Sequence, residues 1–205
     1  MGKSKRIKEI LIATFNKDKA GEISAILKMK GLRFRYVWEF KKISPTIEDG
    51  ATIEENAVKK ARAAMAASGL PSLADDTGLE VDFLSGKPGV FSARFAGEKA
   101  SYEDNNLKLL GLLKDVPNEK RNATFKCVMA LSLRSGEIKL AVGMVRGRIA
   151  HCPAGSNGFG YDPLFIPFGM SKTFAQLSKD EKNSLSHRFI ALKKMRRHLD
   201  VFAKE

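Results

Sequence analysis

The chain has 205 residues, 43% of them hydrophobic, which suits one domain or one domain with two closely packed lobes. Its formal net charge of +13 favours a polyanionic partner, either nucleic acid or a small molecule such as a nucleoside triphosphate. No apolar run approaches the roughly 20 residues that span a bilayer, and the stretch after the basic start MGKSKR is too short for a secretory signal. We therefore expect a soluble cytoplasmic protein without a membrane partner, in which residues 1–6 form a flexible basic tail.

Cysteine and histidine positions restrict the kind of metal site. The two cysteines, Cys127 and Cys152, form no CxxC or Cys/His cluster, which argues against a disulfide framework and a thiolate zinc site. The three histidines, at positions 151, 187 and 198, are too scattered to indicate a transition-metal centre. A metal in this protein would be a hard cation held by carboxylates, and Mg2+ is the candidate.

The first half of the chain alternates between strand and helix patterns. Strands are expected at 7–14, 34–40 and 72–75, and helices at about 17–29 and 54–67. The third strand runs into a turn at Thr77-Gly78, which an extended segment at 79–84 follows. This alternation is typical of an α/β fold.

The second half begins with a predicted hairpin. Residues 123–134 and 138–149 are rich in Val, Leu, Ile and Phe, and the turn Ser135-Gly136 separates them, which indicates two long antiparallel strands. Apolar residues near the C-terminus follow spacings of three and four, which predicts an amphipathic helix that closes the core: Leu185, Phe189, Leu192, Met195, Leu199 and Phe202. We expect a mixed central sheet flanked by helices, with the hairpin as a second lobe.

One loop and one strand end in the first half carry groups suited to phosphate and metal. The loop Thr14-Phe15-Asn16-Lys17-Asp18-Lys19 joins a strand to a helix, where backbone N–H groups, a hydroxyl and lysines suit phosphate binding. It lacks the glycines of a Walker A loop, and an ordinary helix cap at Asn16 is the alternative. Asp75 and Asp76 end an apolar strand, where adjacent carboxylates either bind Mg2+ and position a water or form a polar turn.

Further charged residues lie between these segments. Glu48, Glu54 and Glu55 precede Lys60, which belongs to the helix that begins near residue 53. At 3.6 residues per turn, Lys60 lies at the margin of the apolar stripe of that helix. It either extends along the stripe to solvent or points into a cleft, where it would meet a phosphate.

Two segments of the second half suit a planar ligand. In Gly158-Phe159-Gly160-Tyr161-Asp162-Pro163, the glycines allow close approach of a base on which Phe159 would stack, and a glycine-rich turn capped by a buried aromatic is the alternative. In residues 181–188, Lys182 could meet a phosphate and Arg188 could donate to purine carbonyls. A lone histidine before an apolar helix, such as His187, is more often structural than catalytic.

Four segments in this order resemble the signature blocks of the inosine triphosphatase family: LIATFNKDKAGE, ADDTGLEVDFLSGKPGVFSARFAG, GFGYDPLFIP and KTFAQLSKDEKNSLSHR. The resemblance covers about residues 10–192. It implies a single domain over 1–205 with a mixed sheet, two lobes and a cleft between them, and a homodimer. It further implies hydrolysis of non-standard purine nucleoside triphosphates, such as ITP, dITP, XTP and dXTP, to monophosphate and pyrophosphate.

The resemblance also implies residue roles. Residues 14–19, helped by Lys60 and Lys182, would hold the triphosphate, and Thr77 would contact the substrate. Asp76 would be the catalytic proton acceptor and an Mg2+ ligand, with Glu48 as the second metal carboxylate and Asp49 or Glu55 as alternatives to it. Phe159, Gly160, Tyr161 and Asp162 would form the base pocket, and His187 and Arg188 would read the 6-keto edge of the purine.

Two positions depart from the family pattern, and two other functions compete with it. Phe15 stands where a small or amide residue is common, and Asp18 stands where glycine is common, which places a negative charge near the proposed phosphate loop. The net charge alone would suit a nucleic-acid-binding protein, but Asp75 and Asp76 would repel phosphates without a metal. A pyrophosphatase for modified pyrimidine or methylated nucleotides does not fit the GFGYD and SHR blocks. Nucleic acid is therefore not a required partner.

Overall fold

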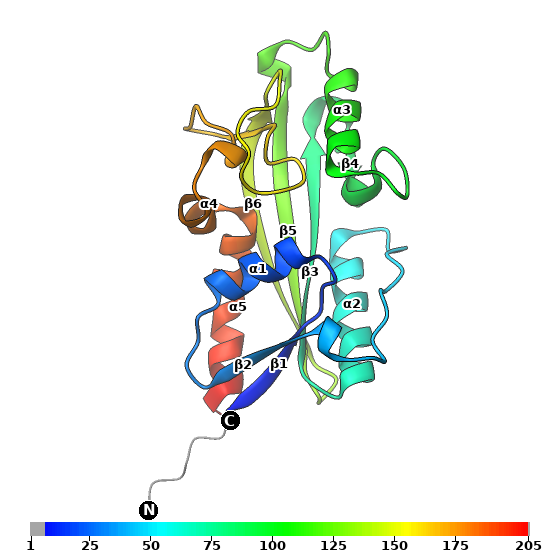
Figure 1. Ribbon diagram of the computed structural model, residues 1–205, viewed down its shortest axis with the longest axis vertical. Helices are drawn as coiled ribbons and strands as arrows, with labels where there is room; N and C mark the ends of the chain where they lie inside the picture. Colours follow the sequence, from blue (N-terminus) through cyan, green and yellow to red (C-terminus); the bar gives the residue numbers. More distant parts are fainter. Residues whose placement is uncertain (1–6, 205) are drawn as a thin grey trace, which may run out of the picture. The chain divides into compact units, whose positions relative to one another are not determined.

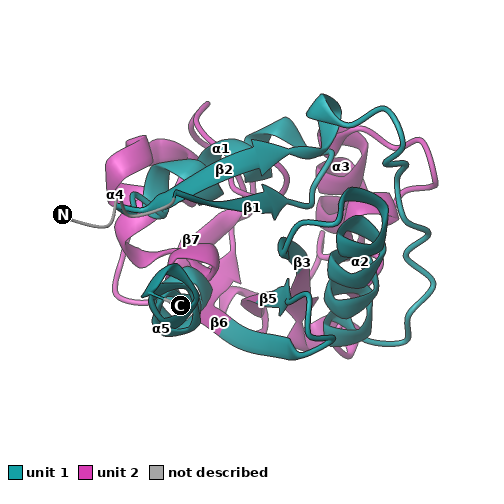
Figure 2. Ribbon diagram, turned by 90° about the horizontal axis from the view of Figure 1, so that it is seen from below, with its two compact units in different colours: residues 1–76, 128–142, 190–205 teal, residues 77–127, 143–189 magenta. Residues whose placement is uncertain are grey.

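A computed structural model describes residues 7–204 of the chain (Figure 1), so the expected basic tail at 1–6 lies outside the described residues. The chain groups into two compact units, which Figure 2 colours separately. Unit 1 comprises the described parts of residues 1–76, 128–142 and 190–205, and unit 2 comprises residues 77–127 and 143–189. Within the described residues, no helix combines the length and apolarity needed to cross a membrane.

The strands form one mixed sheet with the order β2-β1-β3-β5-β6-β7, and β4 pairs with β3. The strands are β1 (Lys8–Ile12), β2 (Leu32–Tyr36), β3 (Ser72–Val81), β4 (Pro88–Gly89), β5 (Asn122–Ser132), β6 (Ile138–Ile149) and β7 (Phe165–Pro167). β1 is parallel to β2 and to β3, whereas β4 is antiparallel to β3 and β7 is antiparallel to β6. The expected α/β fold, with a mixed central sheet flanked by helices, is confirmed.

Unit 1 builds its core from β1 and one face each of α1 (Lys17–Ile26), α2 (Ile53–Ser68) and α5 (His187–Lys204), the last of which begins in unit 2. The side chains of β1 from Ile10 to Ile12 are fully buried. α2 starts at the N-cap Thr52, whose side chain accepts the N–H of Glu55, and ends at Gly69 in the left-handed conformation (φ 69°). These local signals explain why the predicted helix at 54–67 agrees with α2 to within one residue.

Unit 2 packs α3 (Tyr102–Leu112) and α4 (Lys179–Leu185) with an aromatic-rich core. The Phe125 ring makes an edge contact with Phe165 at 4.7 Å between centroids and stacks on the His187 ring at 4.5 Å. The buried Arg121 guanidinium donates to backbone carbonyls, including those of Ile149 at 2.8 Å and Leu113 at 2.5 Å. These bonds satisfy a charged group in the interior, where an unpaired one would be costly.

Two expectations about single elements are wrong. The turn predicted at Thr77-Gly78 is absent, because β3 continues to Val81, and both Leu79 and Val81 are fully buried. The single C-terminal helix is instead α4 followed by α5, with a break at Ser186. The Ser186 hydroxyl accepts the N–H of Phe189 at 3.1 Å, so a serine cap starts the second helix.

The predicted hairpin is confirmed, but it is not a lobe of its own. β5 and β6 are neighbours in the sheet, and the turn between them closes with the N–H of Leu133 donating to the carbonyl of Glu137 at 2.9 Å. Residues 128–142, which include this turn, belong to unit 1, and the remainder of both strands belongs to unit 2. Hairpin geometry is a local property, whereas the grouping depends on which elements pack against each part of it.

Candidate active site

Asp75 and Asp76 lie on β3 just beyond the part that pairs with β1. The pairing of Ile12 with Leu73 is parallel, and the same register continued would place Thr14 opposite Asp75. The loop between β1 and α1 therefore reaches the two carboxylates, and its Lys19 forms an ion pair with Asp75 at 3.2 Å. The two carboxylates therefore lie beside the carboxyl end of β1. They do not end their own strand as expected, because β3 continues to Val81.

Lys60 joins Asp76 to Glu48. Its Nζ donates to Asp76 Oδ1 at 2.8 Å and to Glu48 Oε1 at 2.9 Å, and only 12% of the lysine side chain and 6% of the Asp76 side chain are exposed. Burial raises the pKa of Asp76 above its ordinary value, although Lys60 and Lys19 oppose the shift. Burial would lower the pKa of Lys60, but the nearby carboxylates outweigh it and the pKa is raised. We call Lys19, Glu48, Lys60, Asp75 and Asp76, all in unit 1, the carboxylate–lysine group.

The structure brings Glu48 to this group, and gives the competing carboxylates other partners. Asp49 pairs with the exposed Lys59, and Glu55 accepts the N–H of Ala51 at 2.8 Å. The segment after Glu48 is held by the buried Asn56, whose Oδ1 accepts the N–H of Gly50 at 2.8 Å.

Gly50 and Asn56 hold the segment that carries Glu48, a role that the sequence interpretation missed. A Cβ atom on Gly50 would meet Asn56 Oδ1 at 2.6 Å, closer than such contacts allow, so the position needs glycine. Asn56 precedes Lys60 by four residues and thus lies on the same face of α2. That spacing was the signal available in the sequence, because it places the Asn56 amide on the side of α2 that carries Lys60.

The predicted phosphate loop is a capped helix start in this structure. Asn16 Oδ1 accepts the N–H groups of Asp18 at 2.9 Å and Lys19 at 3.1 Å. The side chains of Phe15, Lys17 and Asp18 are exposed, so the charge of Asp18 faces solvent at a helix N-terminus, where an acidic residue is favourable. The cap therefore exists, and binding of phosphate by residues 14–19 stays a prediction.

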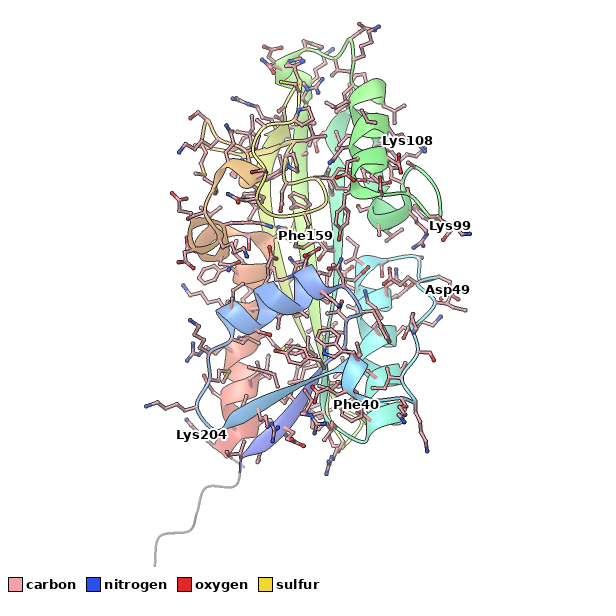
Figure 3. The ribbon with its side chains drawn as sticks, viewed as in Figure 1. Phe40, Asp49, Lys99, Lys108, Phe159 and Lys204 are labelled. Carbon is pink, nitrogen blue, oxygen red and sulfur yellow. The ribbon has the colours of Figure 1, made fainter. Side chains whose placement is uncertain are left out.

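A second group of candidate residues, all in unit 2, surrounds Phe159, which is labelled in Figure 3. Asp162 Oδ2 accepts the N–H of Phe159 at 2.8 Å and pairs with Lys182 Nζ at 2.5 Å. Gly158 has a φ of 74°, and a Cβ there would meet Asp162 Oδ2 at 2.1 Å. The loop can thus take this shape only with glycine at 158.

Two buried cations lie near the face of Phe159. Lys182 Nζ is 4.8 Å from the ring centroid and Arg188 Cζ is 5.7 Å from it, which are cation–π distances. Arg188 also donates through Nη2 to Thr77 Oγ1 at 3.1 Å. We call Thr77, Phe159, Asp162, Lys182 and Arg188 the aromatic group. His187 is buried and stacks on Phe125, which agrees with a structural role.

Two further contacts fix the backbone of the Phe159 loop, and the sequence interpretation did not foresee them. Asn106 Nδ2 donates to the carbonyl of Gly160 at 3.0 Å, and the Tyr161 hydroxyl donates to the carbonyl of Ser92 at 2.9 Å. Burial raises the pKa of Tyr161, so its hydroxyl keeps the proton that this bond needs. The ring of Tyr102, at the start of α3, is 5.9 Å from that of Phe159.

The donor set of the carboxylate–lysine group fits Mg2+ and not a softer metal. Among the described residues, no cluster of three or more His, Cys, Asp or Glu side chains is arranged to hold a metal ion. Mg2+, however, is commonly bound through one or two carboxylates, with waters and substrate phosphates completing six ligands. Glu48 and Asp76, which converge on one cation at Lys60, supply those two carboxylates.

Known proteins match this chain over a range that includes all residues of the carboxylate–lysine group and of the aromatic group. The profile of the Ham1 family matches residues 10–198. The chain is 47% identical to the dITP/XTP pyrophosphatase of Geobacter sulfurreducens over 93% of this chain and 96% of that protein. It is 44% identical to the dITP/XTP pyrophosphatase of Bacillus subtilis over 95% of this chain and 98% of that protein. The solved structure of the Ham1 protein of Staphylococcus aureus is 41% identical and matches with a TM-score of 0.84 over 94% of this chain and 98% of that chain.

Proposed function

Because this chain belongs to the Ham1 family, we propose that it hydrolyses non-standard purine nucleoside triphosphates to the nucleoside monophosphate and pyrophosphate. The substrates are ITP, dITP, XTP and dXTP, in keeping with relatives named dITP/XTP pyrophosphatase. Such hydrolysis cleanses the nucleotide pool and prevents incorporation of these bases into DNA and RNA. The observation that carries the proposal is the pair of carboxylates, the buried Asp76 and the partly buried Glu48, that converge on Lys60.

The carboxylate–lysine group suits attack of water on a phosphoanhydride. Glu48 and Asp76 would hold Mg2+, which supplies charge neutralisation at the phosphates when bound. Asp76 is buried and its pKa is raised, which suits a group that accepts a proton from the attacking water. The water oxygen forms a bond to the α phosphorus, the α–β bridging bond breaks, and the leaving pyrophosphate is stabilised by the ammonium groups of Lys19 and Lys60.

The aromatic group suits recognition of a purine with a 6-keto oxygen. Phe159 would offer its ring for stacking, and Arg188 would donate hydrogen bonds to the keto edge. The family resemblance also implies His187 at this edge, but its burial against Phe125 favours support of the neighbouring Arg188. Adenine carries a 6-amino donor at that edge, which would leave the donors of the protein unpaired, and this penalty excludes ATP. Lys182 was expected at the triphosphate, but its contacts to Asp162 and the Phe159 ring favour a place at the base.

Three further properties are part of the proposal. Turnover depends on Mg2+, as the donor set favours. The protein is a cytoplasmic homodimer, as the family resemblance implies. Chelation by EDTA should abolish turnover and added Mg2+ should restore it, while light scattering on the purified protein tests the dimer.

A substrate screen tests the function. Purified protein with Mg2+ is assayed against ITP, XTP, dITP, GTP, ATP and dTTP, with phosphate and pyrophosphate measured separately. We expect pyrophosphate from ITP, XTP and dITP and little product from ATP and dTTP. GTP shares the 6-keto oxygen, so its turnover tests whether the protein also selects at position 2 of the purine. Equal turnover of ATP and ITP would overturn the base specificity, and release of single phosphates would overturn the choice of bond.

A further inference from the structure

The ammonium group of Lys60 lies where two candidate metal ligands converge, at 2.8 Å from Asp76 Oδ1 and 2.9 Å from Glu48 Oε1. We propose that Lys60 is a placeholder cation, which occupies the carboxylates until a triphosphate binds, so that the protein binds Mg2+ tightly only together with its substrate. This inference rests on the proposed function, because it assigns an order of events to the same site.

The charges of the group support a single cation at a time between Glu48 and Asp76. Three carboxylates, Glu48, Asp75 and Asp76, stand against two ammonium groups, Lys19 and Lys60, so three minus two leaves one negative charge among the five side chains. A divalent ion added beside Lys60 would give these side chains a net positive charge in a largely buried place. Because like charges repel more strongly where water is excluded, the ion and the Lys60 ammonium compete for the same carboxylate oxygens.

A triphosphate removes this competition. Its oxygens offer Lys60 new acceptors, and a lysine has a flexible four-carbon stem with three donors, so its head can turn while α2 stays in place. The same phosphates supply ligands that two carboxylates alone cannot give to Mg2+. Substrate and metal would therefore raise each other's affinity, as linkage requires of any two ligands that favour the same state.

The chain contains a matched control next to Lys60. Lys59 also pairs with an acidic residue of the preceding loop, Asp49, but both side chains are largely exposed, at 44% and 65%. Lys59→Met thus removes a lysine and an ion pair from the same helix without changing the carboxylates that would bind the metal. An exposed pair of this kind contributes little to stability.

The test measures metal binding without nucleotide on the full chain. Mn2+, a paramagnetic stand-in for Mg2+, is titrated into wild type, Lys60→Met, Lys59→Met and Lys60→Arg, and free Mn2+ is followed by electron paramagnetic resonance. We expect weak binding by wild type and Lys59→Met, and binding about tenfold tighter or more by Lys60→Met, a size typical of coupled sites. Lys60→Arg keeps the positive charge and should bind as weakly as wild type.

A second measurement uses thermal unfolding in Mg2+ without nucleotide. Removing Lys60 leaves the buried Asp76 and the partly buried Glu48 without this cation, so Lys60→Met should melt below wild type. Mg2+ should then raise its Tm more than it raises that of wild type. Equal Mn2+ affinity in wild type and Lys60→Met would overturn the placeholder role. If Lys60→Met does not fold, tight Mn2+ binding by wild type or much tighter binding by Lys60→Arg would overturn it.

The metal-binding experiment and the substrate screen can fail independently of each other. A wild-type protein that releases pyrophosphate from ITP but binds Mn2+ as tightly as Lys60→Met would overturn the inference alone. A protein that shows the affinity shift but does not hydrolyse ITP would support the placeholder role and overturn the assigned reaction.

Discussion

The carboxylate–lysine group and the aromatic group hold buried charge in different ways. In unit 1, Lys60 satisfies two carboxylates from two other segments, so the geometry depends on ion pairs between side chains. In unit 2, Asp162 also forms an ion pair with Lys182, but it accepts a backbone N–H of its own loop as well, and the cations lie against the face of an aromatic ring. The first arrangement can exchange one cation for another, whereas the second fixes a surface of constant shape. We therefore expect changes in unit 1 to alter turnover and changes in unit 2 to alter affinity and selectivity.

The largest effect is expected from Asp76→Asn. An amide cannot accept the proton of the attacking water, and general-base catalysis contributes about 10²- to 10⁴-fold, so kcat for ITP should fall by about 10³-fold. KM should rise as well, because Asp76 is also a proposed Mg2+ ligand and metal and substrate bind together. Steady-state kinetics measures this, with circular dichroism as the check on folding. Asp49→Asn, on an exposed carboxylate of the same unit, should stay within about twofold of wild type. Retained turnover in Asp76→Asn would remove Asp76 from its catalytic role.

Phe159→Ala tests whether the aromatic group of unit 2 sets the affinity for substrate. Stacking of a base on an aromatic ring is worth about 1–3 kcal/mol, so KM for ITP should rise about tenfold or more with kcat nearly unchanged. The control is Phe168→Ala, which removes an exposed phenylalanine elsewhere in unit 2. A loss confined to kcat would contradict the expectation that the aromatic group sets affinity and the carboxylate–lysine group sets turnover.

Gly50→Ala sharpens the account of how Glu48 is placed. The added Cβ must displace Asn56 or the loop that carries Glu48, so we expect about tenfold lower activity that higher Mg2+ partly restores. Gly21→Ala is the matched control, because nothing lies within 4 Å of its Cβ and it is inside α1. That change should leave kinetics unaltered and stabilise the protein by about 0.5–1 kcal/mol. Equal kinetics for both variants would show that Gly50 does not position Glu48.

Asn106→Ala should have a smaller effect, of the kind expected of unit 2. It leaves the carbonyl of the partly buried Gly160 without this donor, and loss of such a hydrogen bond costs about 1 kcal/mol of stability. We expect KM for ITP to rise severalfold and kcat to hold, measured beside the unfolding free energy in urea. Leu107→Ala, at the neighbouring exposed position on α3, should leave KM unaltered. An unchanged KM in Asn106→Ala would mean that the loop keeps its shape without this bond.

The smallest effect is expected at the start of α3. Hydrogen bonds from the backbone and hydroxyl of Ser101 lower the pKa of Asp104, so its contribution to stability is present above the ordinary aspartate pKa. That contribution is lost as the pH falls through the lowered pKa of the folded state. Asp104→Asn should therefore melt slightly below wild type at neutral pH, and the difference should vanish in acid. A difference that persists at low pH would assign it to something other than the carboxylate charge.

Several elements followed from local signals in the sequence. The helix at 54–67, the hairpin around Ser135-Gly136 and the apolar stripe of the last helix agree with α2, β5–β6 and α5. Caps, turn residues and periodicity act over a few neighbouring residues, so they are legible without knowledge of the fold. The four signature blocks likewise identified the family, because their order and spacing are properties of the chain alone.

Long-range packing decided the rest. Thr77-Gly78 has turn composition, yet β3 continues through it because burial of Leu79 outweighs local preference. Glu48, Asp49 and Glu55 are equivalent carboxylates in the sequence, and only the folded chain shows that Glu48 is the one that reaches Lys60, in a loop held by the bond between Asn56 and Gly50. The partners of Lys60 and Lys182 could not be read from the chain, because an ion pair forms between side chains that distant segments bring together. The sequence thus supplied the chemical groups and the local elements, and tertiary contacts chose which groups meet.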